Sequence, residues 1–242
     1  MKPSRVNKVL RKDFSSRYGI KVDNLRLTRR YGNSLFPHIT ADEHVEICFV
    51  QVSFSGRKYT YVFKARETEV DGEIKGYLEN PSVTPSLVSY GRNPDYILTA
   101  YAGTSLGDLR RGELSRDLFV EVGQSLRELK NNHGDLDLSN LIRNEIPYND
   151  PSITRPNSDK NVLFIDFCYY GVRNKTYDLA ELSSSLVNFD FHGEELVKYV
   201  SGLFRGFGRH VDIRKFRKNL RDLTDDADDV KRLVRILEKI SN

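Results

Sequence analysis

Three short stretches of the sequence carry side chains whose types and spacing suit chemistry on a phosphate. "HGDLDLSN" (133–140) holds Asp135 and Asn140 five positions apart, and "FIDF" (164–167) places Asp166 at the end of an apolar run. Lys64 ends another apolar stretch, "YVFK". Transfer of a γ-phosphoryl group needs a lysine on the α/β-phosphates, a carboxylate to orient it, a base beside the acceptor hydroxyl and two oxygen ligands for Mg²⁺. The sequence supplies a candidate for each role.

These residues also have simpler interpretations. Aspartate and asparagine are common in loops because their side chains bond to nearby backbone, so Asp135 and Asn140 could be turn formers. A single lysine on a strand, such as Lys64, is usually a solvated edge residue. Asp166 favours a functional interpretation, because a carboxylate at the end of a buried strand is costly unless it is paired or bound to metal.

The first half of the chain, before residues 133–140, has the pattern of β-strands. His44–Phe54 and Lys58–Ala65 alternate apolar and polar residues around "SGR", which predicts a β-hairpin. Between Phe49 and Val50 the alternation shifts by one residue, which indicates a β-bulge.

Helical periodicity replaces the strand pattern further along the chain. A short helix is expected around Glu73–Asn80, then a buried strand over Tyr96–Tyr101, with a hinge at Ala100–Gly103. A longer helix starts near Ser115, a suitable N-cap. A polar loop over 146–160 and a short strand over 161–167 follow, and the remainder is helical.

Composition indicates a folded, intracellular protein. The 242 residues include 38 basic and 34 acidic ones, a formal net charge of +4, which favours solubility over obligate polyanion binding. Cys48 and Cys168 lie far apart inside apolar runs, so both are interpreted as core residues in a reducing compartment. The start of the chain lacks an apolar leader, and no stretch approaches the ~20 apolar residues of a membrane span. We therefore expect a cytoplasmic protein without membrane association.

The amino-terminal arm is the most basic part of the chain. Residues 1–31 hold ten lysines and arginines against Asp13 and Asp23. Val6, Leu10 and Phe14 recur at helical spacing, which predicts an amphipathic helix with a basic face. The arm could contact an acidic protein or RNA, or it could be a solvated helix or a frayed terminus.

The stretch "HGDLDLSN" resembles the catalytic loop of the protein-kinase-like superfamily, which reads His-Arg-Asp, four further residues and then Asn. Gly134 replaces the arginine, as in the atypical branch that includes RIO and Bud32-type kinases and the aminoglycoside and choline phosphotransferases. The resemblance implies a two-lobed α+β protein-kinase-like fold. Residues 1–101 would form an amino lobe built on a small antiparallel β-sheet, and residues 102–242 a mainly helical carboxyl lobe with the catalytic loop.

The same resemblance implies roles for individual residues with ATP and Mg²⁺ as cofactors. Asp135 would be the catalytic base, with Asn140 and Asp166 as metal ligands. Lys64 would hold the phosphates, and Val62, on the same strand face, would form part of the adenine floor.

Further roles follow from the flanking motifs. Glu73 would pair with Lys64, with Glu79 as second choice. Backbone groups of Ala100 and Ala102 would meet adenine. His133 would pack under the loop and Asp137 would face solvent. Asp178, in "TYDLAEL", would hold the catalytic loop, or it would simply cap a helix.

The sequence departs from the superfamily pattern at three places. Cys168 stands where glycine is usual, "RRYGNS" (29–34) has a single glycine where a glycine-rich loop would cover the phosphates, and only eleven residues separate Asp166 from Asp178. The short spacing and the absence of Ala-Pro-Glu after it imply that the conventional activation segment is missing. Because no large acidic pocket for a cationic substrate is recognisable, the resemblance predicts an atypical serine/threonine protein kinase. The alternatives are a small-molecule kinase of the aminoglycoside phosphotransferase type and a pseudokinase scaffold.

Overall fold

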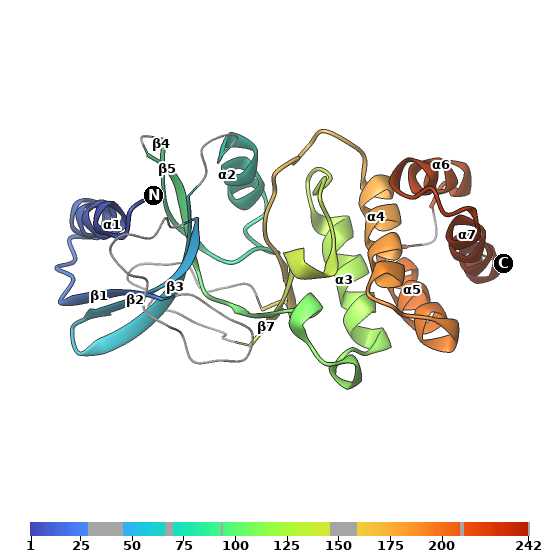
Figure 1. Cartoon of the computed structure of the whole chain (residues 1–242), viewed down its shortest axis with the longest axis horizontal. Coiled ribbons are helices and arrows are strands. Elements are labelled where there is room, and N and C mark those ends of the chain that lie inside the picture. Colours follow the sequence, from blue (N-terminus) through green and yellow to red (C-terminus); the bar gives the residue numbers. More distant parts are fainter. Residues whose placement is uncertain (29–45, 66–69, 93, 146–158, 209–210, 242) are drawn as a thin grey trace.

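A β-sheet lobe and a helical lobe lie at opposite ends of the molecule in the computed structural model (Figure 1). The structure describes residues 1–28, 46–65, 70–92, 94–145, 159–208 and 211–241. The predicted phosphate-covering loop at 29–34 and most of the predicted loop at 146–160 lie outside these ranges. The α+β class and the strand-rich amino half predicted from the sequence are confirmed.

The amino lobe is built on a five-stranded antiparallel sheet with strand order β1-β2-β3-β5-β4. The predicted hairpin is present as β2 and β3, joined at Ser55 and Gly56, whose φ angles of 49° and 73° suit a tight two-residue hairpin turn. The strands are β1 (Asn24–Thr28), β2 (Ile47–Phe54), β3 (Arg57–Ala65), β4 (Leu87–Arg92) and β5 (Asp95–Ala100).

The bulge predicted within the first strand of the hairpin is wrong. β2 pairs with β3 without interruption from Ile47 opposite Lys64 to Phe54 opposite Arg57. Both faces of β2 are apolar for different reasons: Cys48 and Val50 are buried in the lobe's core, whereas Ile47 and Phe49 line a cavity on the other face. The two apolar faces of one regular strand produced the apparent phase shift. A register shift does occur in β4, between Leu87 and Ser89.

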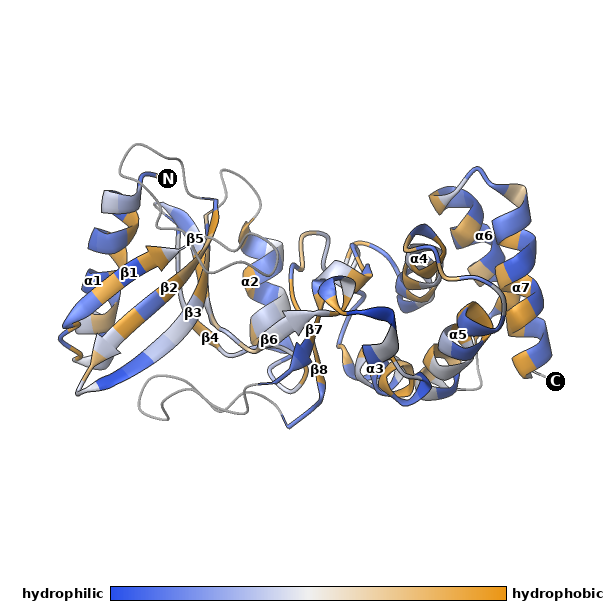
Figure 2. Ribbon diagram, turned by 60° about the horizontal axis from the view of Figure 1, so that its bottom comes forward, coloured by the Kyte–Doolittle hydropathy of each residue, from blue (hydrophilic) through white to orange (hydrophobic). Residues whose placement is uncertain are grey.

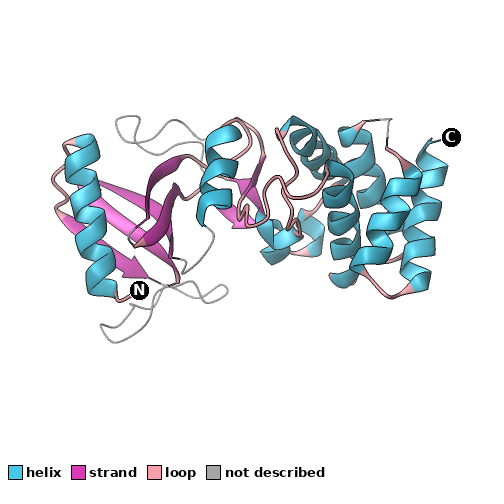
Figure 3. Ribbon diagram, turned by 90° about the horizontal axis from the view of Figure 1, so that it is seen from above, coloured by secondary structure: helices cyan, strands magenta, loops and turns pink. Residues whose placement is uncertain are grey.

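The basic arm forms helix α1 (Pro3–Tyr18), which packs against the outer face of this sheet (Figure 3). Val6, Leu10 and Phe14 are buried in the core of the amino lobe, so the helix is amphipathic as predicted and the frayed-terminus alternative is wrong. Asp13 accepts hydrogen bonds from Ser89 and Tyr96 of the sheet. Whether the exposed basic face binds a partner stays a prediction.

Helix α2 (Val70–Glu79) lies at the junction of the two lobes. It starts three residues before the predicted Glu73–Asn80. Val70, Ile74 and Tyr77 belong to the same hydrophobic cluster as the carboxyl lobe, so α2 packs against that lobe.

The carboxyl lobe is mainly helical, as predicted. Helix α3 (Arg116–Glu128) has Ser115 as its N-cap, whose hydroxyl accepts the Leu118 N–H. β6, β7 and β8 form a small sheet in that order, and the loop with Asp135 lies between α3 and β7. The other elements are β6 (Gly103–Ser105), the 3₁₀ turns η1 (Leu106–Asp108), η2 (Arg111–Glu113) and η3 (Leu138–Asn140), β7 (Leu141–Asn144), β8 (Val162–Phe164), α4 (Lys175–Asn188), α5 (Gly193–Phe207), α6 (Ile213–Leu223) and α7 (Ala227–Ser241).

Close packing of α3 against α5 fixes the helical lobe. A Cβ at Gly206 would lie 1.9 Å from the Val120 carbonyl oxygen, and one at Gly123 would lie 2.1 Å from that of Leu203. Only glycine permits this approach. Apolar residues of α3, α4, α5, α6 and α7 form one cluster, distinct from that under α1 (Figure 2). The lobe boundary at residue 101 stays a prediction. None of the described helices is both long and apolar enough to span a bilayer.

Candidate active site

Lys64, Glu73 and Asp166 meet where the two lobes join. The Lys64 ammonium lies 3.0 Å from Glu73 Oε1 and 2.6 Å from Asp166 Oδ1. Glu73 is almost fully buried, with 1% of its surface exposed, so its carboxylate depends on the lysine for compensation. Glu79, the second choice for this pair, is wrong: it accepts a hydrogen bond from the Tyr170 hydroxyl, and its nearest ammonium is that of Lys75 at 3.9 Å.

Asp166 adopts a backbone conformation that non-glycine residues rarely use. Its φ of 63° lies in the left-handed region, which costs on the order of 1 kcal/mol and persists where surrounding structure enforces it. The next residue, Phe167, is fully buried, with its ring centroid 4.6 Å from that of His133 and 5.4 Å from that of Tyr77. A Cβ at Gly76 would lie 2.3 Å from the Phe167 ring, so glycine there makes room for the aromatic anchor. This packing holds Asp166 toward Lys64.

Cys168 is not a core residue, contrary to the sequence-based prediction, whereas Cys48 is buried. The Cys168 thiol is partly exposed and donates a hydrogen bond to Asp166. Among the described residues, Cys168, Glu73 and Asp166 form a group whose potential metal-ligand atoms all lie within 4.8 Å of one another. Because its neighbours in sequence are apolar, Cys168 was assigned to the core although it lies at the site.

The loop with Asp135 and Asn140 is held by its own side chains. Asn140 Nδ2 donates to the Asp135 carbonyl at 2.7 Å, which leaves the amide oxygen of Asn140 as the group available to a ligand. Asp137 was predicted to face solvent, but its side chain bonds within the loop. Its carboxylate accepts the N–H groups of Ser139 and Asn140 and so caps η3.

Three side chains of helix α4 accept hydrogen bonds from backbone N–H groups of the same loop. Asp178, fully buried, accepts the N–H groups of His133 at 2.7 Å and Gly134 at 2.9 Å. Glu181 accepts the Leu136 N–H at 2.6 Å, and the Ser185 hydroxyl accepts that of Leu138. The helix-capping alternative for Asp178 is wrong, because Asn174 is the N-cap of α4. Glu181 and Ser185 were missed by sequence reasoning, although their spacing from Asp178 by three and seven residues places all three on one helix face.

His133 lies under the loop, as predicted, with no exposed surface. Burial lowers the pKa of His133 to about 4, so the ring is neutral near pH 7. Its Nε2 lies 2.7 Å from the Ile165 carbonyl oxygen, and its Nδ1 accepts the Asp135 N–H. The ring therefore links the loop that contains Asp135 to the residue before Asp166.

The backbone conformation and close packing at position 134 explain why glycine replaces arginine there. Its φ is 92°, and a Cβ there would lie 2.4 Å from the Tyr169 carbonyl oxygen. The segment after Asp166 thus passes directly over Gly134. It reaches α4 within a few turn residues, so the described structure contains no extended segment between Asp166 and Asp178.

Asp178→Asn is expected to change how stability depends on pH. Burial raises the pKa of Asp178 from 3.8 to about 7, so the folded protein keeps a proton that the unfolded chain releases between these values. Asp178 therefore makes the free energy of unfolding fall as pH rises, by ~1.4 kcal/mol per pH unit. His133, with its pKa lowered from 6.5 to about 4, contributes a rise of similar slope between pH 4 and 6.5.

In the parent protein these two slopes largely cancel, and in Asp178→Asn only the rise due to His133 remains. Urea unfolding at intervals from pH 4.5 to 6.5 measures the difference, with Asp117→Asn, an exposed acid on α3, as the matched control. Parallel curves for parent and Asp178→Asn would show that Asp178 does not titrate in this range.

A cavity of about 380 Å³ lies between the sheet and the small sheet of the carboxyl lobe. Its lining includes the predicted residues Lys64, Glu73, Val62, Ala100, Ala102 and Asp166. Asp135 and Asn140 are not part of the lining. Asn140 is nevertheless next to it, because its carbonyl accepts the N–H of Ile165, a lining residue.

The hinge backbone is partly used within the protein. The Ala100 N–H donates to the Ser86 carbonyl, and the Ala102 carbonyl accepts the Glu145 N–H, both at 2.9 Å. That these two residues contact adenine stays a prediction.

No protein-family model matches the chain, and no curated protein matches it in sequence. Solved structures do match its fold. An aminoglycoside-3'-phosphotransferase of type VIII superposes with a TM-score of 0.54 at 13% identity, covering 98% of each chain. A choline/ethanolamine kinase family protein from Mesorhizobium loti gives 0.52 at 10% identity, covering 97% of this chain and 84% of that one.

A third match is a spectinomycin phosphotransferase in complex with ADP and spectinomycin, with a TM-score of 0.51 at 9% identity, covering 96% of this chain and 93% of that one. At such identities the likeness establishes architecture alone. Together with the two lobes and the sheet order, it shows that the chain has the protein-kinase-like fold.

Proposed function

We propose that the chain is an ATP- and Mg²⁺-dependent phosphotransferase that acts on an alcohol group. The observation that carries this proposal is the placement of the Lys64 ammonium between Glu73 and Asp166, all three of which line the cavity. In this arrangement Glu73 fixes Lys64, and Lys64 binds the α/β-phosphates of ATP. Val62 and the backbone of Ala100 and Ala102 hold the adenine ring.

The donor set fits a magnesium ion. Asn140 presents an amide oxygen, because its nitrogen is used by Asp135, and Asp166 presents a carboxylate with a quarter of its side chain exposed. These are the oxygen ligands that Mg²⁺ prefers. When bound, the ion would neutralise charge on the β- and γ-phosphates. Asp135 accepts the proton of the acceptor hydroxyl, and α4 keeps its backbone in place.

For the acceptor we favour a small cationic alcohol. Burial raises the pKa of Glu181, and the negative charges of Asp135 and Asp137 add to this rise. Three carboxylates therefore lie around the loop, and grouped carboxylates attract a cation. The three matched structures are named for aminoglycoside, spectinomycin and choline or ethanolamine phosphorylation. The short link between Asp166 and α4 offers little platform for a peptide, so the serine/threonine protein kinase function is kept as the alternative.

The test is incubation of the purified chain with γ-labelled ATP and Mg²⁺ and a panel of acceptors. The panel contains choline, ethanolamine, spectinomycin and aminoglycosides on one side, and basic and acidic protein substrates on the other. Asp135→Asn serves as the inactive control. Label on a small amine alcohol supports the proposal, label on serine or threonine of a protein supports the alternative, and nucleotide binding without transfer to any acceptor indicates a pseudokinase.

A further inference from the structure

A second large groove lies at the end of the molecule opposite the β-sheet, between α5 and α7 (Figures 1 and 3). Its volume is about 1110 Å³. Leu196 and Ile236 are buried at its base, while Val197 and Ile240 expose 45% and 37% of their surface into it. Large apolar side chains exposed this far are few among the described residues, and two of them line this groove.

The rim of the groove is strongly basic. Its acidic residues are Glu194 and Asp228, and the Asp228 carboxylate is already paired with Lys231 at 3.0 Å. Within the described part of the chain, Arg116, Arg235 and Lys239 make no ion pair. The basic residues that line the groove are Arg116, Lys198, Lys231, Arg232, Arg235 and Lys239.

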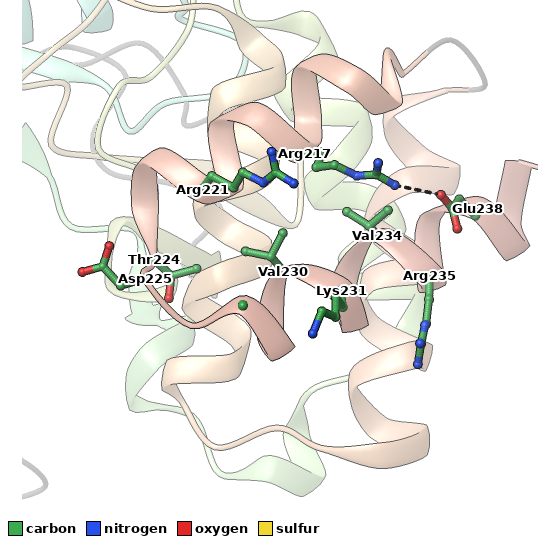
Figure 4. Close-up of a pocket in the computed structure, with 10 residues that line it drawn as sticks. Arg217, Arg221, Thr224, Asp225, Val230, Lys231, Val234, Arg235 and Glu238 are labelled. Carbon is green, nitrogen blue, oxygen red and sulfur yellow. Dashed lines mark hydrogen bonds and ion pairs between the residues drawn. The ribbon is translucent and has the colours of Figure 1, made fainter.

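The orientation of the α7 side chains shows which of them face α6. Figure 4 shows the neighbouring pocket between α6 and α7, where Val230 and Val234 point toward α6 and Lys231 and Arg235 point away from it. Arg217 in that pocket is neutralised by Glu238 at 3.1 Å. Lys231 and Arg235 line both this pocket and the groove, where Ile236 and Ile240 of α7 also lie, so basic and apolar side chains of α7 are neighbours in the groove.

We propose that the groove between α5 and α7 binds a protein segment that carries both acidic and apolar side chains. Charge complementarity selects an acidic partner, and the apolar floor selects a segment that covers Val197 and Ile240. A nucleic acid backbone would satisfy the rim but gain nothing from these two side chains. α5 has 15 residues, about 22 Å of helix, which matches a helical segment of roughly 15 residues.

The binding site is independent of phosphoryl transfer. The groove shares no residue with the cavity that holds Lys64, and α5 and α7 lie on the far side of the carboxyl lobe from it. Variants in the groove should therefore leave ATP turnover unchanged, and failure of the proposed activity would not affect this inference.

The experiment selects partners from a displayed library of random 16-residue peptides on the full chain. Counter-selection uses two double variants, Val197→Ser with Ile240→Ser and Lys198→Glu with Lys239→Glu. The enriched sequences are expected to combine acidic residues with apolar ones spaced three or four apart. A synthetic peptide of the enriched type is then titrated by fluorescence anisotropy at 50 and 300 mM salt.

Both double variants should weaken binding about tenfold, equivalent to about 1.4 kcal/mol. The loss from charge reversal should shrink at high salt, whereas the loss from the apolar variant should not. Lys218→Glu with Val172→Ser, the same types of change outside the groove, should bind as the parent does. Absence of enrichment overturns the proposal, as does an enriched peptide that binds both double variants normally. Tighter binding of a single-stranded RNA that tolerates the apolar variant would assign the groove to nucleic acid, and a dimer abolished by the same variants would assign it to a second copy of the chain.

Discussion

Asp166→Asn is expected to abolish Mg²⁺-dependent ATP turnover while the protein stays folded. Asp166 presents the only carboxylate in the proposed metal site, and its loss removes the charge that would hold the ion against the phosphates. Asparagine tolerates the left-handed backbone at this position, where φ is 63°, so the fold should survive. The Lys64–Glu73 pair, 3.0 Å apart in the parent, does not involve Asp166 and should persist in the variant. Turnover measured with labelled ATP should fall to the level of the reaction without Mg²⁺.

Two further variants make this result specific. Asp166→Ala should be equally inactive but somewhat less stable, because alanine is strained at positive φ. Asp23→Ala removes an exposed aspartate outside the site and should leave turnover unchanged. Parental turnover by Asp166→Asn, with thermal unfolding at the parental temperature, would show that Asp166 is not a metal ligand.

The residues that meet at the site could be chosen from the sequence because the choice depends on residue types at fixed spacing. Lys64 and Glu73 are nine residues apart on a strand and a helix, whereas Asp166 lies about a hundred residues further along in a loop, yet each could be chosen from its local motif. Their distances of 3.0 and 2.6 Å depend on how the two lobes pack, which the motifs do not encode. The roles assigned to these residues remain proposals until variants are assayed.

Other features needed the tertiary structure. β1 and β4 were missed because each is short and one carries a register shift, so neither shows clean alternation. Cys168 was assigned to the core because its neighbours are apolar, but the chain turns sharply after Asp166 and brings the thiol to the carboxylate. Local apolar pattern reports average burial, and it fails where the backbone leaves a regular element.

The supports of the catalytic loop show a second limit. Asp178, Glu181 and Ser185 accept backbone N–H groups from residues about 45 positions earlier in the chain. A polar residue on a helix carries no signal of which backbone it will meet. Buried polar groups must nevertheless find partners, so three polar side chains on one face of a largely buried helix could have been recognised as supports for a neighbouring loop.

Lys64→Ala and Asp135→Ala are each expected to lower the turnover rate on the order of a hundredfold or more, in line with losses when one electrostatic or acid-base group is removed. The double variant should lose less than the product of the two effects, because both residues stabilise one transition state. Both Lys64→Ala and Lys64→Met leave the buried Glu73 carboxylate without its ammonium. Lys64→Met keeps the length of the side chain, so comparison of the two variants separates loss of the charge from loss of packing.

The two residues should differ in ATP binding, which separates their roles. Asp135 lies outside the lining of the cavity, whereas Lys64 is part of it. Asp135→Ala should therefore bind ATP with nearly parental affinity and fail in transfer, whereas Lys64→Met should bind more weakly as well. Titration with a fluorescent ATP analogue, alongside single-turnover measurements, tests both statements. Full multiplicativity of the two losses would mean that the residues act in separate steps, and near-parental transfer by Asp135→Ala would mean that the acceptor proton leaves without this carboxylate.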